Sequence, residues 1–236
     1  MNQAKIRILV ASFLLLLILL LCVSQVINYQ NNLETQKIEQ ATESYAETHS
    51  FTYQLGETAT LDSSKDKEGD SYNWVAGFGW DGTIEATLNE VKIYKQNQFD
   101  QLNGKYLIND DMERQLNRLE DPKNPLIVCY QLTLHSINAT PENGNGFNIQ
   151  TFNLYGDAEF ASSEPIYIQG TYYGTKKYNG TNAYKYTLTK GETKSITIGY
   201  LVGSDIKNTE LSLAFGQSNS EKYVVKINPS EIKEAK

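Results

Sequence analysis

A long apolar run without charges opens the chain. Residues 8–27 contain no Asp, Glu, Lys or Arg, and the run from Phe13 to Leu21 reads FLLLLILLL. A helix rises about 1.5 Å per residue, so about 20 apolar residues cross a bilayer core of about 30 Å. The run therefore predicts a single transmembrane helix. Lys5 and Arg7 precede it, which favours a cytoplasmic N-terminus and an extracellular position for the rest of the chain.

Two other fates of this segment are open. Cleavage as a signal peptide would fall before Gln25, but the apolar run is longer than the roughly 7–15 residues of a signal peptide core. Lipidation at Cys22 would require a small residue before it, and Leu21 occupies that position. A retained anchor is the preferred prediction because both processing sites match poorly. All three alternatives place the rest of the chain outside the cytoplasm.

Period-two alternation begins after a polar linker. Residues 28–50 are rich in Gln, Glu, Asn and Thr, which predicts a stalk that is helical in part. Apolar and polar residues alternate from Ile84, and the phase shifts by one residue near Asn89 and Glu90, which predicts a β-bulge there. The strands predicted from this alternation cover residues 51–61, 72–79, 84–93, 126–137, 149–155, 165–173, 183–189, 194–202, 209–216 and 222–228.

One segment breaks the alternation. Residues 110–119 begin with acids and end near Arg118, as the helix dipole prefers, so they predict a short helix. Met112, Leu116 and Leu119 would form its narrow apolar stripe, packed on the rim of the sheets. Short strands at regular spacing, separated by turn residues, are typical of an immunoglobulin-like antiparallel β-sandwich.

The predicted fold is therefore mainly β, with one short helical insertion and one transmembrane helix before it. The predicted organisation is a cytoplasmic tip and anchor in residues 1–27, a stalk in 28–50, the sandwich in 51–228 and a C-terminal tail in 229–236.

Several segments of the predicted sandwich also have a familiar order. The first is an early strand over Thr83–Tyr94, and the second is a central strand over Pro125–Asn138 that ends in an Asn-centred turn. In the third, over Tyr186–Val202, a leucine is followed by a glycine–glutamate turn and then by a strand. The last is a closing pair of strands over Leu211–Phe215 and Tyr223–Ile227. This layout resembles a group of exported bacterial domains of unknown function with a telokin-like, immunoglobulin-like sandwich. Such domains are typically lipoproteins or membrane-anchored proteins of Gram-positive bacteria. The resemblance implies a fold and a location but no catalytic residues, and the helical insertion departs from the usual form.

The composition narrows the classes of partner. Lys5 and Arg7 are two of 21 basic residues, against 28 acidic ones, so the chain beyond them carries a net charge of −9. Nucleic acids and anionic polymers select basic surfaces, so this balance argues against both. Cys22 and Cys129 are the only cysteines, and Cys22 lies in the membrane segment. No internal disulfide is expected, so the domain must depend on its hydrophobic core.

Residues that usually carry catalysis or bind metals are scattered. Cys129 and His135 share the polar face of one predicted strand, but at six residues' separation they lie on the order of 20 Å apart, too far for a dyad. His49 lies at the stalk–domain junction, so a zinc site is not expected either. Carboxylates without the spacing of a calcium loop occupy predicted loops or the helix start: Asp62, Asp66, Asp70, Asp110, Asp111, Glu120 and Asp121. No catalytic residue, metal site or cofactor is predicted.

The most distinctive side chains are aromatic. Trp74, Phe78 and Trp80 lie close together near several glycines and include both tryptophans of the chain. Large aromatic side chains on loops can stack on sugars or anchor a protein partner, so these three are the candidate binding residues. The alternative is that they pack in the sandwich core or cover its edge.

The sequence thus predicts a non-catalytic binding or interaction module, held at the bacterial cell membrane by one helix, with its C-terminal domain extracellular. The expected partners are the membrane and a protein or envelope ligand, and nucleic acid is not expected. One alternative is an envelope hydrolase that uses loop carboxylates. Another is an accessory subunit of a membrane complex that binds through the transmembrane helix.

Overall fold

The chain divides into two compact units, Met1–Thr48 and His49–Lys236. The computed structural model describes residues 20–21, 23–37, 50–66, 77–103, 112–142, 146–169, 184–216 and 222–235, without the side chains of 100–103 and 112–113.

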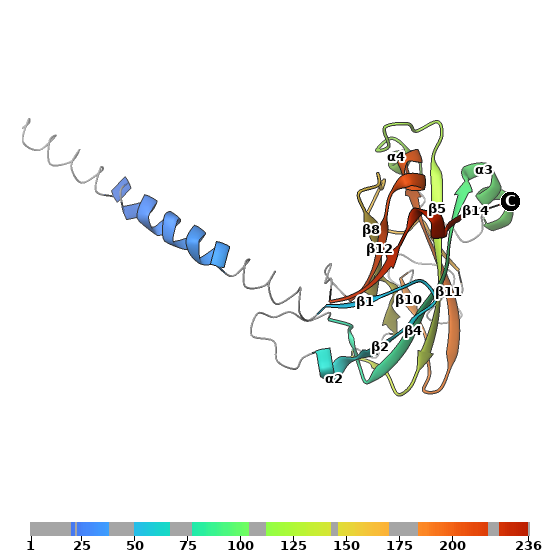
Figure 1. Ribbon diagram of the computed structural model, residues 1–236, viewed down its shortest axis with the longest axis horizontal. Helices are drawn as coiled ribbons and strands as arrows, with labels where there is room; N and C mark the ends of the chain where they lie inside the picture. Colours follow the sequence, from blue (N-terminus) through green and yellow to red (C-terminus); the bar gives the residue numbers. More distant parts are fainter. Residues whose placement is uncertain are drawn as a thin grey trace, which may run out of the picture. The chain divides into compact units, whose positions relative to one another are not determined.

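In the first unit, the described residues are helical and exposed. The helix includes residues 28–37, so the helical part expected in the stalk is present (Figure 1). The predicted membrane segment, residues 8–27, lies mostly outside the described residues. Among the helices that are described, none is both long and apolar enough to cross a bilayer.

The second unit is mainly β, and most of its strand pairs are antiparallel. Its larger sheet contains, in order across it, β14 (Ile232–Glu234), β4 (Thr83–Lys95), β5 (Leu126–Ser136), β11 (Thr193–Val202) and β9 (Tyr167–Gln169). A sixth strand, β2 (Thr58–Asp62), also pairs with β4. β4 runs parallel to β14 and antiparallel to β2 and β5.

A four-stranded sheet packs against the larger one (Figure 1). Its order is β1 (Phe51–Tyr53), β13 (Tyr223–Ile227), β12 (Leu211–Phe215) and β8 (Phe152–Gly156), with β1 parallel to β13. Two short pairs complete the described strands: β3 (Trp80–Asp81) with β6 (Thr140–Pro141), and β7 (Phe147–Asn148) with β10 (Lys185–Tyr186).

One hydrophobic core joins the two sheets. Leu132 of β5, Leu213 of β12 and Val225 of β13 are fully buried in it. The phenol of Tyr130 crosses the core and donates a hydrogen bond of 2.6 Å to the carbonyl oxygen of Phe152, which satisfies its buried hydroxyl. The inner face of each sheet is therefore apolar, and the polar positions of the alternation fall on the outer faces.

Two predictions about the central strands are confirmed. The register of β4 against β5 shifts between Leu88 and Glu90, where the bulge was expected. β5 places alternate residues from Leu126 to Leu134 in the core, while Cys129 and the residues that alternate with this set face the other side. Local period-two patterning was sufficient for both predictions.

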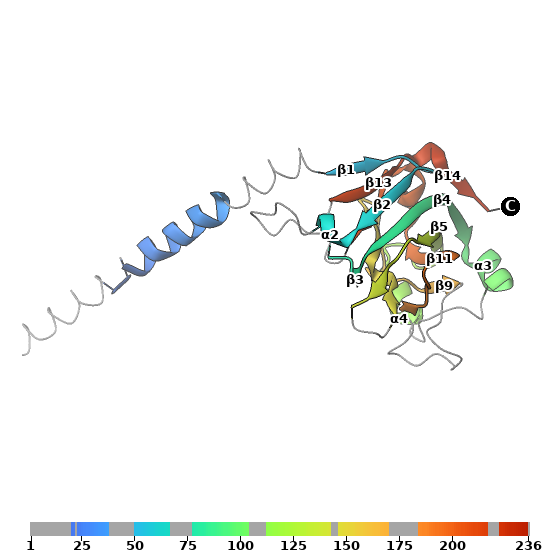
Figure 2. The same ribbon diagram turned by 90° about the horizontal axis from the view of Figure 1, so that it is seen from below.

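The helices lie between and beside the strands. They are α2 (Ser63–Asp66), α3 (Gln96–Asn103) and α4 (Met112–Leu116), with 3₁₀ turns η2 (Ile149–Thr151), η3 (Ser204–Asn208) and η4 (Pro229–Glu231). α4 lies within the predicted helix 110–119, whereas α3 is not predicted by the alternation. α3 lies against β4 and β5, and Figure 2 shows it on the side of the domain away from β1 and β13.

Other expected elements differ in extent. The strand expected over 149–155 begins with the turn η2, and the strand expected over 183–189 is only the short β10. Residues 72–76 of another expected strand lie outside the described residues, and 77–79 are not in a strand. The expected tail 229–236 contains η4 and β14, because β4 offers the backbone groups of an open edge to Ile232–Glu234.

Candidate ligand pocket on the outer sheet face

Polar side chains form ordered rows on the outer face of the larger sheet. One row across neighbouring strands contains Thr58, Thr87, Thr133 and Ser195. The hydroxyls of Thr58 and Thr87 are hydrogen-bonded at 2.7 Å, and Asn89 donates to the hydroxyl of Thr133 at 2.8 Å. Alternation along a strand and register between strands together produce this grid.

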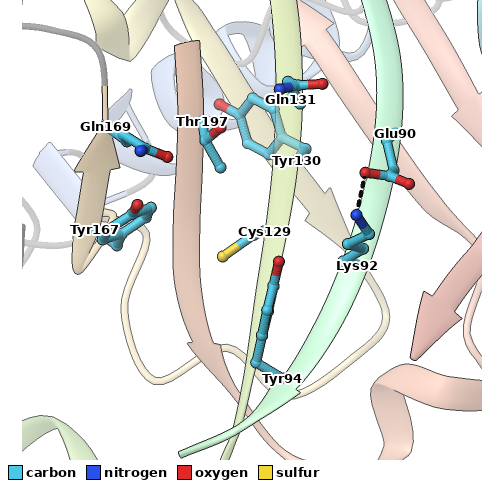
Figure 3. A pocket seen from close by; sticks show the side chains of 9 residues that line it. All are labelled: Glu90, Lys92, Tyr94, Cys129, Tyr130, Gln131, Tyr167, Gln169 and Thr197. Carbon is cyan, nitrogen blue, oxygen red and sulfur yellow. Dashed lines mark ion pairs between the residues drawn. The ribbon is translucent and has the colours of Figure 1, made fainter. Parts of the chain in front are cut away.

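A cavity of about 170 Å³ lies on this face, where the next two rows meet. Figure 3 shows Gln169, Thr197, Gln131 and Glu90 in one row, and Tyr167, Cys129 and Lys92 in the other. The described residues that line it are Glu90, Lys92, Tyr94, Cys129, Tyr130, Gln131, Tyr167, Gln169 and Thr197. Gln131 and Gln169 are exposed, whereas Cys129 and Tyr167 are buried, so the cavity has an open rim and a covered base.

The bulge in β4 brings three side chains to this cavity. Ile84, Ala86 and Leu88 face the core before the bulge, whereas Val91 and Ile93 face it afterwards. Without the extra residue, even-numbered positions would continue to face inward. The bulge therefore turns Glu90, Lys92 and Tyr94 to the outer face, where they line the cavity.

Gly199 of β11 makes room for the base of the cavity. Its register partners are Cys129 on β5 and Tyr167 on β9. A Cβ atom at this position would lie 2.8 Å from the sulfur of Cys129 and 3.2 Å from the Cβ of Tyr167. Only a residue without a side chain lets these two neighbours approach across the strand.

Helix α3 supports the aromatic side of the cavity. Its Phe99 is fully buried in a second apolar cluster on the outer face, together with Cys129 and Tyr167. The ring of Phe99 lies edge-on to Tyr167 at 4.7 Å between centroids, and edge-on to Tyr94 at 6.1 Å. The inserted segment thus covers one end of the outer face and holds both tyrosines in place.

The remaining members of this cluster come from several segments. They are Leu119, Ile127, Ala161, Ile166 and Leu201, with Leu116 packed against them. Leu116 and Leu119 belong to the stripe predicted for the helical insertion, so their packing on the sheets is confirmed. The side chain of Met112 is not described.

The charged groups at the cavity form ion pairs, with one carboxylate between two ammonium groups. The ammonium of Lys92 lies 2.6 Å from one carboxylate oxygen of Glu90, and that of Lys233 on β14 lies 3.1 Å from the other. The hydrogen bond from Lys92 is the largest cause that lowers the pKa of Glu90, and the same bond raises the pKa of Lys92. Both groups therefore stay ionised and paired at neutral pH.

The other ionisable groups of the lining are neutral. Burial raises the pKa of the Cys129 thiol, and burial is also the main reason that the pKa of Tyr94 is raised. A protonated thiol with 4% of its surface exposed is a weak nucleophile. The cavity thus offers hydroxyls, amides and one internal ion pair.

The predicted aromatic site residues lie elsewhere. Phe78 and Trp80 are 2% and 1% exposed, and their rings stack at 4.9 Å between centroids within the main core. Phe78 also contacts Tyr223, and Trp80 contacts Phe147. The core-packing alternative describes both side chains, and their faces are covered by protein rather than offered to a ligand. Trp74 lies outside the described residues.

The remaining chemical candidates are not brought together. His135 shares a hydrogen bond of 2.9 Å with Thr193 on the polar outer face, while Cys129 belongs to the apolar cluster. Asp62 accepts hydrogen bonds from Ser64, which lower its pKa. His49, Asp70, Asp110 and Asp111 lie outside the described residues. Within the described part of the chain, no group of three His, Cys, Asp or Glu side chains is placed to hold a metal ion.

A set of carboxylates does gather at one end of the domain. A surface hollow is lined by Glu120, Asp121, Asp157, Glu159, Ser204 and Asp205. Glu159 accepts a hydrogen bond from the backbone of Glu120 at 2.6 Å, and Asp205 accepts one from the backbone of Glu159 at 2.8 Å. These bonds connect three loops, which explains why the carboxylates lie together.

The residues of the cavity were not predicted as a site, although local signals exist. Gln131 and Thr197 belong to predicted strands, at positions that face solvent when the neighbouring residues face the core. Gly199 interrupts a strand of β-branched and aromatic residues, which often marks a close approach of neighbouring groups. The grouping itself depends on pairing between strands that are far apart in sequence.

The fold and the cavity define a mainly β, two-sheet domain with a small polar pocket on the outer face of the larger sheet. No family model and no curated protein matches the chain. One similar solved structure is a chain described as a lipoprotein from Staphylococcus aureus subsp. aureus NCTC 8325. Its TM-score is 0.31 at 12% identity, over 64% of this chain and 87% of that one. At this level, the likeness carries no argument about fold or function.

Proposed function

We propose that this chain is a membrane-anchored, extracellular binding module of a bacterial surface, with an immunoglobulin-like sandwich that takes a small polar ligand in the outer-face pocket. The observation that carries the proposal is the pocket itself. Gln131, Gln169 and Thr197 supply two amides and a hydroxyl to its lining, and buried aromatic rings support the floor of the cavity. These polar groups are attached to paired strands, so the backbone that carries them needs no ordering on binding.

Binding without catalysis agrees with the chemistry of the lining. The Glu90 carboxylate is paired with two ammonium groups, and the Cys129 thiol is protonated and buried. Neither group has the free, poised character that a general base or a nucleophile requires. Binding of a ligand without catalysis requires no change in the protonation or pairing of these groups.

The anchor is supported by the apolar run in residues 8–27. Leu20, Leu21, Val23, Val26 and Ile27 belong to this run, and their side chains are between 50% and 63% exposed. Exposed apolar side chains on a helix are stabilised by lipid, which supports a single membrane-spanning segment with the N-terminus in the cytoplasm. The partners are then the membrane and an envelope ligand, and the acidic balance disfavours nucleic acid.

The test uses the full chain in a zwitterionic detergent that has no sugar headgroup. Saturation-transfer NMR would measure binding of three probe sets: neutral methyl glycosides, amino acids and dipeptides. The wild type and Thr133→Ala should bind at least one set, and the double variant Gln131→Ala/Gln169→Ala should not. Thr133 is a matched control because it lies two residues from Gln131 on the same face of β5, outside the cavity.

Mass spectrometry of the same samples would test the absence of catalysis. Each probe should be recovered unchanged after long incubation. Conversion of a probe by the wild type, or equal binding by the wild type and the double variant, would contradict the proposal. Circular dichroism and thermal unfolding of each variant would show that the fold is retained.

A further inference from the structure

We infer that the ligand of this pocket is a single neutral sugar ring, one unit of an envelope glycan. The inference rests on the proposed function and adds the chemical class of the ligand. Three properties of the pocket carry it: its charge, the type of its hydrogen-bonding groups and its size.

The charge of the pocket favours a neutral ligand. Its one carboxylate and its one ammonium, on Glu90 and Lys92, are joined at 2.6 Å, and Lys233 occupies the other carboxylate oxygen at 3.1 Å. A charged ligand would compete with the partly exposed Glu90–Lys92 pair of the lining for one of its members. A neutral ligand leaves the ion pairs intact.

The polar groups of the rim suit hydroxyls. Gln131, Thr197 and Gln169 are register partners on three neighbouring strands, so their side chains stand in one row about 5 Å apart from strand to strand. Each of these side chains can both donate and accept a hydrogen bond. A sugar hydroxyl can also do both, so every contact in the row can be satisfied.

A peptide matches this row less well. Its backbone N–H only donates and its carbonyl only accepts, which restricts the orientations that satisfy three mixed groups at once. The ring of the half-buried Tyr94 adds apolar surface for the C–H side of a sugar ring. The observations therefore favour a sugar over a peptide.

The size of the pocket limits the ligand to one ring. Its volume of about 170 Å³ is below the roughly 300–1,000 Å³ of pockets that enclose drug-sized ligands. Gln131 and Gln169 are exposed at the rim, so the rest of a glycan can continue into solvent. One ring in the pocket with the chain outside is the arrangement that these dimensions allow.

The experiment compares sugars that share a ring and differ in charge. Methyl glucoside and methyl N-acetylglucosaminide are the neutral probes, methyl glucuronide is the anion and methyl glucosaminide is the cation. The full chain in the same detergent should bind at least one neutral probe, and the charged probes up to about fivefold more weakly. Gln131→Ala and Gln169→Ala should each weaken the neutral probe by up to about tenfold, since each removes one hydrogen bond.

Two further variants separate the sugar contacts from general damage. Tyr94→Phe keeps the ring that contacts Phe99 and removes only the hydroxyl, so the fold should be retained with a smaller loss of binding. Thr133→Ala should bind as the wild type does. Tm values within a few degrees of the wild type would exclude unfolding as the cause of any loss.

The outcomes distinguish the inference from the proposed function. If amino acids or dipeptides bind and lose binding in the Gln variants while no glycoside binds, the sugar inference is overturned and the proposed function stands. Equal binding of the glucuronide or the glucosaminide also overturns the inference alone. If no probe distinguishes the wild type from the Gln variants, both are overturned.

Discussion

At the scale of single residues, Gly199 makes room for the base of the pocket. It lies between Cys129 and Tyr167 on neighbouring strands, and the space that a Cβ would need is already occupied. Protein interiors are packed closely enough that one added methyl group displaces its neighbours. The depth of the pocket thus depends on the absence of one side chain.

The substitution Gly199→Ala is expected to lower the free energy of unfolding by about 1–3 kcal/mol through overpacking. The cost should be smaller in a Cys129→Ala background, because the sulfur 2.8 Å from the new Cβ is then gone. Urea unfolding of the wild type, both single variants and the double variant gives this coupling directly. Equal cost in both backgrounds would show that the sulfur is not the obstacle.

At the scale of elements, α3 packs on the larger sheet and supports the pocket there. The segment Gln96–Asn103 has little apolar character, yet its Phe99 is fully buried between Tyr94 and Tyr167. The ion pair between Lys233 of β14 and Glu90 of β4 links a second unpredicted element to the same place. Both elements are stabilised by tertiary contacts more than by local propensity.

Phe99→Leu should lose less stability than the roughly 3–5 kcal/mol of truncation to Ala, and it should remove the ring edges that hold the two tyrosines. In tyrosine-selective NMR spectra, the signals of Tyr94 and Tyr167 should shift. Phe152→Leu is the matched control, since Phe152 is equally buried but lies in the main core against Phe215. Unchanged Tyr94 and Tyr167 signals in Phe99→Leu would show that α3 does not hold these two tyrosines in place.

At the scale of the whole molecule, the proposed attachment and the proposed recognition belong to different parts of the chain. The sandwich has its own core, shared by both sheets, and the pocket is made from its strands alone. Anchoring by a helix of about 20 apolar residues is effectively permanent, whereas a single acyl chain binds only weakly.

We expect the chain isolated from membranes to keep its N-terminal segment. Its intact mass should include the residues before Gln25, and it should remain in the membrane fraction after an alkaline carbonate wash, because a spanning helix is not held by electrostatic contacts. A mature N-terminus at Gln25 would show cleavage instead. The mass of a chain that begins at a lipid-modified Cys22 would show that the protein is a lipoprotein instead.

Several features followed from the sequence alone because they depend on neighbouring residues. The alternation of β5 and the phase shift at Asn89 and Glu90 are local, since side chains on a strand point to opposite faces in turn. The mainly β composition of the domain and the helix at residues 112–116 belong to the same group. The apolar run that predicts the anchor is equally local.

Only the tertiary structure decided which of these side chains meet. Phe78 and Trp80 are compatible in sequence with both an exposed binding loop and a core, and long-range packing placed them in the core. Gln131, Thr197 and Gln169 become one row only through the register of β5, β11 and β9. Register is determined by contacts between segments far apart in the chain, and for that reason the pocket has no signature in the sequence.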